Sequence, residues 1–269
     1  MQVFLVKQNE KFSIFKYLFK KIEVIQDKII INFNIVKLKR KIKIAKKISK
    51  ILIKNNSNTV IISKNLKKDI MFLDLLYSQQ LNIITGNRLF KMILEDYLEK
   101  VIVKNNLKKE ETEIAVTVNN NNEWIRNLII NLSKKYKTIK IVTNNIKYFK
   151  ELEEKLFEKY GIIVFVTNNK KKALKKTNII LNLDFPEELI NKYIIFENSI
   201  IINLEEKVKI HKKRFCGKII NNYNIDLKEH SKISQSLKKE EYKEFDLKDL
   251  VECYVLNNKE ELKNVFPKV

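Results

Sequence analysis

Three apolar runs of the sequence end in asparagine, a residue type that can hold a ligand through its side chain or its backbone. IAVTV is followed by Asn119 and three further asparagines, IVT by Asn144, and FVT by Asn168. If these runs are strands of one parallel sheet, their carboxyl ends lie along one edge, where open α/β proteins bind ligands. Asparagine also tolerates left-handed backbone and caps helices, whose N-termini attract anions. The candidate ligand-binding residues at this edge are Asn119, Asn121, Asn144, Asn168 and, from the run LNLD, Asp184.

A simpler interpretation stays open, in which each asparagine only caps the helix that follows. A dinucleotide is normally held by a glycine-rich loop after the first strand, because glycines let the backbone approach the pyrophosphate. Residues 119–122 are all asparagine, and Glu123 places a negative charge where the anion would sit. The end of the second strand, Asn144, also lacks the acidic residue expected for the ribose.

The stretch ITGNRLF contains a second candidate anion site. Gly86 can adopt positive φ at a turn from strand to helix, Asn87 can cap the helix, and Arg88 lies in its first turn. An arginine in this position can clamp a carboxylate or a phosphate, here facing a cleft between two domains. An arginine that is only solvated is the alternative.

A basic amphipathic helix is predicted over residues 36–56, with an apolar stripe formed by Leu38, Ile42, Ala45, Ile48 and Leu52. Its polar face, on which Lys41 is also expected, can contact the phosphates of nucleic acid or an anionic membrane. Few aromatic residues are interleaved, so base recognition is not indicated. The alternative is a solvated face whose lysines reflect an A/T-rich genome. The anionic-surface candidates are Lys39, Arg40, Lys43, Lys46, Lys47 and Lys50.

No residue constellation predicts a catalytic activity. His211 and His230 are the only histidines and stand among lysines, and Cys216 and Cys253 form no CxxC pair. A structural zinc site or a disulfide framework is therefore not expected, and whether the chain is an enzyme is left open.

The elements that must position these residues alternate regularly between 113 and 204. Short continuous apolar runs, typical of strands buried on both faces, alternate with helical patterns at a spacing of about 25 residues. This alternation predicts βαβ units and a parallel sheet. Gly161 stands where a helix C-cap is expected. The predicted strands are 114–118, 139–143, 162–167, 178–183 and 199–204, with helices at 123–136 and 145–160 between the first three.

The order of the predicted elements divides the chain into three parts. Residues 1–106 form a small α/β domain with two strands around Gln26-Asp27, the basic helix 36–56 and a long connecting helix 88–106. Residues 107–225 form the parallel-sheet domain, and 226–269 a mostly helical tail. This order resembles the Rossmann architecture of shikimate dehydrogenases and glutamyl-tRNA reductases, in which a substrate domain precedes the nucleotide domain. The resemblance implies a degenerate Rossmann-like domain, because asparagines 119–122 replace the glycine-rich loop.

Composition limits the functional classes. The net charge is +22, and residues 1–50 alone carry 14 basic and 3 acidic residues, which weakly favours an anionic partner. Neither a signal peptide nor a run long enough to span a membrane is present, so a cytoplasmic location is expected. The leading hypothesis is a protein that binds a small anionic ligand or nucleotide between its domains. An NAD(P)-dependent oxidoreductase with an atypical phosphate loop and a nucleic-acid or anionic-membrane binder are the alternatives.

Overall fold

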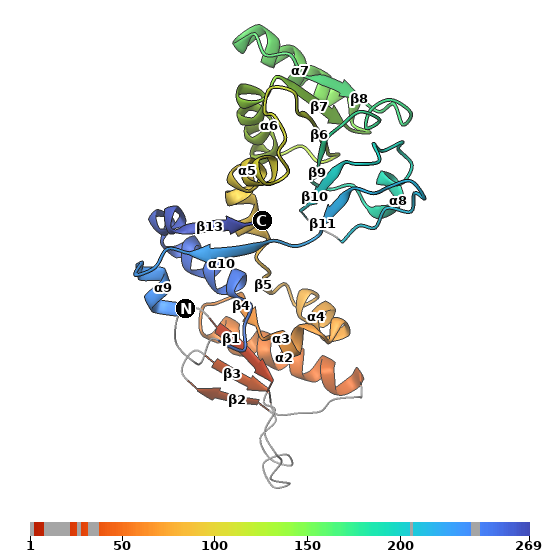
Figure 1. The fold of residues 1–269 in the computed structure, drawn as a ribbon. Coiled ribbons are helices and arrows are strands. Elements are labelled where there is room, and N and C mark those ends of the chain that lie inside the picture. The colour runs from red at the N-terminus through yellow and green to blue at the C-terminus, as the bar shows by residue number, and fades with distance from the viewer. Residues whose placement is uncertain (1–2, 8–21, 26–27, 32–37, 205–206, 238–242) are drawn as a thin grey trace. The chain divides into compact units, whose positions relative to one another are not determined.

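The computed structural model describes residues 3–7, 22–25, 28–31, 38–204, 207–237 and 243–269 (Figure 1). Two compact units are present. The first contains Met1–Leu89 and Ile225–Phe266, and the second contains Phe90–Asn224 and Pro267–Val269. None of the helices in these ranges is long and apolar enough to cross a membrane.

A six-stranded parallel sheet forms the centre of the second unit. Its strand order is β11-β10-β9-β6-β7-β8, and every neighbouring pair is parallel. Read from the other edge, the strands follow the 3-2-1-4-5-6 order of Rossmann folds. This confirms the predicted α/β fold with a Rossmann-like sheet. The strands are β6 (Glu113–Thr117), β7 (Thr138–Val142), β8 (Phe165–Thr167), β9 (Ile179–Asn182), β10 (Ile200–Asn203) and β11 (Lys218–Ile220), of which β11 was not predicted.

Helices α6 (Glu123–Lys135) and α7 (Ile146–Tyr160) connect the first three of these strands. Each presents an apolar stripe to the sheet, with Leu128 and Ile129 buried on α6 and Phe149 on α7. Helix α7 ends at Gly161, whose φ of 64° provides the left-handed C-cap that the sequence predicts. Helix α5 (Asn87–Lys104) lies beside α6, because Lys135 of α6 forms ion pairs with two glutamates of α5.

The opposite face of this sheet is covered mainly by loop. Among the described residues between β9 and β11, the short α8 (Glu187–Ile190) is the only helix. Its apolar side chains Phe185, Tyr193 and Val208 are buried against Ala115 and Ile201 of the sheet. On this face of the sheet, irregular segments therefore take the place of regular helices and still fill the core.

The first unit contains a mixed sheet of order β2-β3-β1-β4-β5. β2 (Ile22–Ile25) and β3 (Lys28–Ile31) are antiparallel, as expected, and the turn at 26–27 lies outside the described residues. β1 (Val3–Lys7) was not predicted. Ile48 and Leu52 of helix α2 pack with Phe72 and Leu76 of helix α4 against the sheet. The other elements are β4 (Thr59–Ile62) and β5 (Asn82–Ile84), with α2 (Leu38–Lys54), α3 (Lys64–Lys67) and α4 (Ile70–Tyr77).

The C-terminal segment contributes to the core of the first unit. Phe245 and, from helix α10 (Leu247–Asn257), Leu250 and Cys253 are buried against Ile61 and Ile84. The segment also contains helix α9 (Lys232–Leu237) and the 3-10 helix η2 (Lys259–Asn264). β12 (Asn224–Leu227) pairs with β13 (Val265–Lys268), a pairing that the sequence did not predict.

Candidate functional site

The strand order of the second unit reverses between β6 and β9, and the crevice of Rossmann folds lies at the carboxyl ends of these strands. Asp184, two residues after β9, points its carboxylate at the loop after β6. Its two oxygens accept hydrogen bonds from the backbone N–H groups of Asn119 and Asn120, each at 2.7 Å. A carboxylate of the chain itself thus occupies the backbone donors that were predicted for an anion.

A row of polar side chains continues along the same edge of the sheet. Thr117 Oγ1 donates to Asn182 Oδ1 at 2.7 Å, and Asn182 Nδ2 donates to Asn203 Oδ1. Asn203 Nδ2 donates to Asn221 Oδ1 at 3.1 Å. Thr117, Asn182 and Asn203 are buried, so these bonds satisfy groups that would otherwise be costly to bury. Of these four residues only Asn203, near the end of the predicted strand 199–204, was expected at this edge, because only the folded sheet aligns residues 117, 182 and 221 with it.

The asparagines of the three predicted clusters have different roles. Asn122 caps α6, its Oδ1 accepting the Ile125 N–H at 2.9 Å, as the capping interpretation expects. Asn119 Oδ1 accepts the Asn144 N–H at 2.8 Å, which links the loops after β6 and β7. Asn121 and Asn168 are exposed. Asn119, Asn144 and Asp184 are therefore brought together, whereas Asn121 and Asn168 are not part of this network.

The turn at Gly86–Arg88 also faces a carboxylate of its own unit. Gly86 has a φ of 81°, as expected, and α5 begins at Asn87. Glu252 of α10 is buried and accepts the Leu89 N–H at 3.0 Å at the start of α5. Burial raises the pKa of Glu252, and backbone hydrogen bonds from Leu89 and Arg88 oppose this rise. The Arg88 side chain is exposed, with one long contact of 3.4 Å to Asn82 Oδ1.

A second buried carboxylate of α10 forms an ionic cluster in the first unit. Lys67 Nζ donates to Asp246 Oδ2 at 2.6 Å and to Asp249 Oδ2. The Asp249 side chain is buried, and its Oδ1 has no hydrogen-bond partner within the described part of the chain. Burial raises the pKa of Asp249 to about 6, although Lys67 lowers it. No sequence pattern signals this cluster, since Lys67 lies 179 and 182 positions from the two aspartates.

The exposed side of helix α2 carries a continuous basic face. At about 100° per residue, its exposed cations fall within a sector of about 120°. None of them makes an ion pair or a hydrogen bond with another described residue, and α2 contains no acidic residue. The face consists of Lys39, Arg40, Lys43, Lys46, Lys47, Lys50 and Lys54, and is called the α2 basic face below.

Two expectations about this helix require correction. Lys41 does not lie on the basic face but is buried, and its Nζ contacts Asp69 Oδ1 at 2.7 Å. Leu38 is 49% exposed rather than part of the apolar stripe. The buried sector is centred on Ile48 and includes position 41, so a lysine there must be paired within the fold. Residues 36 and 37 of the predicted helix lie outside the described residues.

Comparison with known proteins finds weak similarity to solved structures alone. No family model and no curated protein matches the sequence. Among solved structures, L-tryptophan dehydrogenase from Nostoc punctiforme is similar at 10% identity and a TM-score of 0.34, over 65% of this chain and 49% of that one. Ornithine carbamoyltransferase from Pyrococcus furiosus matches at 10% identity and a TM-score of 0.32, over 82% and 75%. The mitochondrial ornithine carbamoyltransferase from Coccidioides immitis matches at 11% and 0.32, over 95% and 83%.

The chain spans about half the length of the dehydrogenase. Because the TM-scores are low, the fold is assigned from the strand order of the sheet and not from these matches. The class that this order defines is the Rossmann-like α/β proteins.

Proposed function

We propose that the chain binds nucleic acid through the α2 basic face, by contact with phosphates and without recognition of base sequence. The observation that carries this proposal is the set of seven exposed cations in one sector, none paired with a described carboxylate. Lysine and arginine that neutralise phosphates release counterions, and this release drives non-specific binding.

The geometry of the face suits an extended polyanion. Lys39 and Lys54 are 15 positions apart, which corresponds to about 22 Å along the helix axis. Four pairs of lysines stand at i and i+4, beginning at positions 39, 43, 46 and 50. Each such like-charge pair destabilises a helix by about 0.2–0.5 kcal/mol, and a bound polyanion would relieve this repulsion. Lysine predominates and no aromatic residue lies on α2, which favours phosphate contact over base readout.

The anionic-membrane alternative has less support from the burial of α2. A helix that lies in a membrane interface inserts its apolar face among the lipids. The apolar residues Ile44, Ile48 and Leu52 of α2 are at most 5% exposed, because they fill the core of the first unit. On α2, Leu38 and Ile53 are the large apolar side chains left exposed, at 49% and 68%. A membrane would therefore be bound mainly by headgroup attraction, whereas a nucleic acid requires nothing more than the exposed basic face.

The small-anion and NAD(P) alternatives have less support from hydrogen bonding. The donors expected to hold an anion after β6 face Asp184, and those at the start of α5 face Glu252. At either place, an anionic ligand would be repelled by the carboxylate and would have to displace it from the donors.

The test is a salt titration of duplex DNA binding, followed by fluorescence polarisation. The variant replaces Lys39, Lys43, Lys46 and Lys50 together by glutamine. We expect the slope of log K against log salt to become less steep by about 3–4, since each lost phosphate contact contributes about 0.9.

The matched control replaces four exposed lysines of the second unit, Lys170, Lys171, Lys172 and Lys175, and therefore removes the same charge. A loss of slope as large in the control as in the α2 variant, or no DNA binding at low salt, refutes the proposal. Binding of the wild type to anionic vesicles but not to DNA would favour the membrane alternative.

A further inference from the structure

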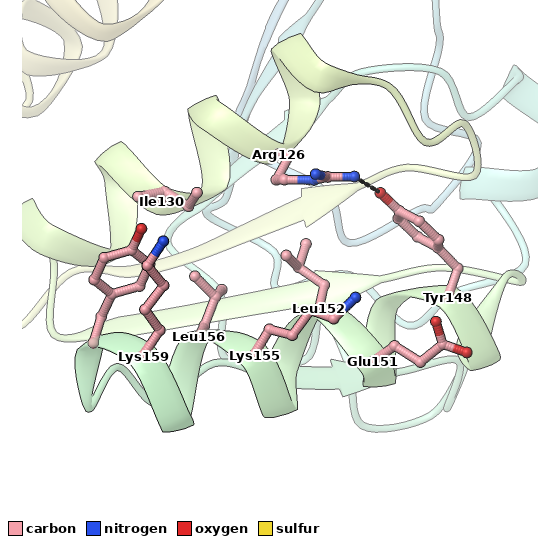
Figure 2. Close-up of a pocket in the computed structure, with 9 residues that line it drawn as sticks. Arg126, Ile130, Tyr148, Glu151, Leu152, Lys155, Leu156 and Lys159 are labelled. Atoms are coloured by element: carbon pink, nitrogen blue, oxygen red, sulfur yellow. Dashed lines mark hydrogen bonds between the residues drawn. The ribbon is translucent and has the colours of Figure 1, made fainter.

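An open groove lies on the helical side of the second unit, between α6 and α7 (Figure 2). It lies on the exposed side of the helices and not among the carboxyl ends of the strands, so it is distinct from the crevice that Asp184 fills. Its volume is about 190 Å³. The residues that line it are Arg126, Ile130, Tyr148, Glu151, Leu152, Lys155, Leu156, Lys159 and Tyr160.

The floor of the groove is apolar. Ile130 of α6 faces Leu152 and Leu156 of α7 between the two helices, as Figure 2 shows. Leu152 and Leu156 are 6% and 1% exposed, and they belong to the apolar stripe of α7. Leu152 and Leu156 therefore belong to the core, and the apolar surface that the floor still exposes comes from Ile130 and Tyr148, which are half-buried. An apolar ligand can remove this surface from water.

The rim of the groove is mostly cationic. Arg126, Lys155 and Lys159 surround it, and Glu151 is the one acidic residue among those that line it. Arg126 Nη2 donates to the Tyr148 hydroxyl at 3.1 Å, which holds the guanidinium above one end of the floor. A guanidinium has five N–H donors, so most of its donors are available for a bidentate bond to a carboxylate.

From this floor and rim we propose that the groove binds a small organic monocarboxylate with an apolar body of about six carbons. The carboxylate pairs with Arg126 and the body covers Ile130 and the ring of Tyr148. The volume of the groove is smaller than that of sites for drug-sized ligands, which is about 300–1,000 Å³. It corresponds to the volume of about six water molecules. That space fits one ring or a short chain. The proposal is independent of the function assigned to α2.

The test is a titration of isotope-labelled full-length protein, followed by backbone amide chemical shifts in NMR. The probes are hexanoate and benzoate, which distinguish an aliphatic from an aromatic body, with hexan-1-ol and hexylammonium as charge controls. We expect saturable shifts within residues 126–160 at a Kd of about 1 mM, the range for a ligand of eight or nine heavy atoms. Hexan-1-ol should bind at least fivefold more weakly, and hexylammonium should cause no saturable shift.

Two variants separate the groove from general charge attraction. Arg126→Gln should weaken hexanoate binding by about five- to tenfold, whereas Lys170→Gln, an exposed lysine outside the groove, should leave the Kd unchanged. Arg126 is exposed, so its replacement leaves the core intact. Equal affinity for hexylammonium, an unchanged Kd in Arg126→Gln, shifts confined to other residues, or no saturation at 10 mM would each overturn the proposal.

Discussion

The carboxylate of Asp184 takes the position of a bound anion, and its removal should create a site that inorganic anions can fill. In the wild type, the Asn119 and Asn120 N–H groups both donate to it at 2.7 Å. Hydrogen bonds to a charged group contribute about 1.5–3 kcal/mol each. Because Asp184 is only half-buried and Asn120 is exposed, hydrogen bonds to water can replace part of this contribution. We expect Asp184→Ala to lower the free energy of unfolding by about 2 kcal/mol.

The corresponding fall in Tm is about 4–8 °C. Sulfate should restore part of the loss, because it can accept the same two backbone N–H groups of the loop that precedes α6. At ten times its Kd, a ligand that binds only the native state contributes about 1.4 kcal/mol. The assay is thermal unfolding of the wild type, Asp184→Ala and Glu154→Ala, an exposed residue on α7, at matched ionic strength with sulfate or chloride.

The comparison between variants is essential because sulfate stabilises most proteins non-specifically. Sulfate should therefore raise the Tm of Asp184→Ala by several degrees more than it raises the Tm of the two other proteins. If Asp184→Ala is as stable as the wild type, or if sulfate raises all three Tm values equally, the carboxylate does not substitute for an anion.

Two further predictions concern single positions. Burial raises the pKa of Asp249 from 3.8 to about 6, so between about pH 4 and 6 the folded state binds more protons than the unfolded state, and this residue makes stability fall as pH rises. Between about pH 4 and 6, the wild type should therefore lose roughly 3 kcal/mol of unfolding free energy relative to Asp249→Asn, measured by urea unfolding. A difference between the two proteins that does not change with pH would contradict the assigned burial effect. Gly161→Ala places a β-carbon on a residue with φ of 64°, so it should lower the free energy of unfolding by about 1 kcal/mol in chemical denaturation. Gly161→Asn should lower it by less, because asparagine tolerates this backbone conformation. An alanine variant as stable as the wild type would refute the strain at this position.

The alternation of apolar runs and amphipathic helices was sufficient to predict the centre of the molecule. Strands buried on both faces read as continuous apolar blocks, so β6, β7, β9 and β10 were found. The edge strand β8 was found from its apolar run, although Phe165 is exposed. β11 was missed because its three residues, Lys218–Ile220, are exposed or half-buried and carry little pattern. Gly86 and Gly161 were predicted in left-handed conformation, since glycine adopts it without strain.

What the sequence determined by itself was local: strands β6 to β10, the helices α2, α5, α6 and α7, the caps at Asn122 and Gly161, and the basic character of α2. Only the tertiary structure decided which donors are available. Asp184 lies 65 positions from Asn119, and Glu252 lies 163 from Leu89. Folding nevertheless brings Asp184 to the backbone donors of the loop after β6 and Glu252 to a donor at the start of α5. Pattern and propensity act over a few residues, whereas the pairing of buried polar groups depends on the packing of distant segments. The same packing buries Lys41 against Asp69 and leaves the remaining cations of α2 facing solvent.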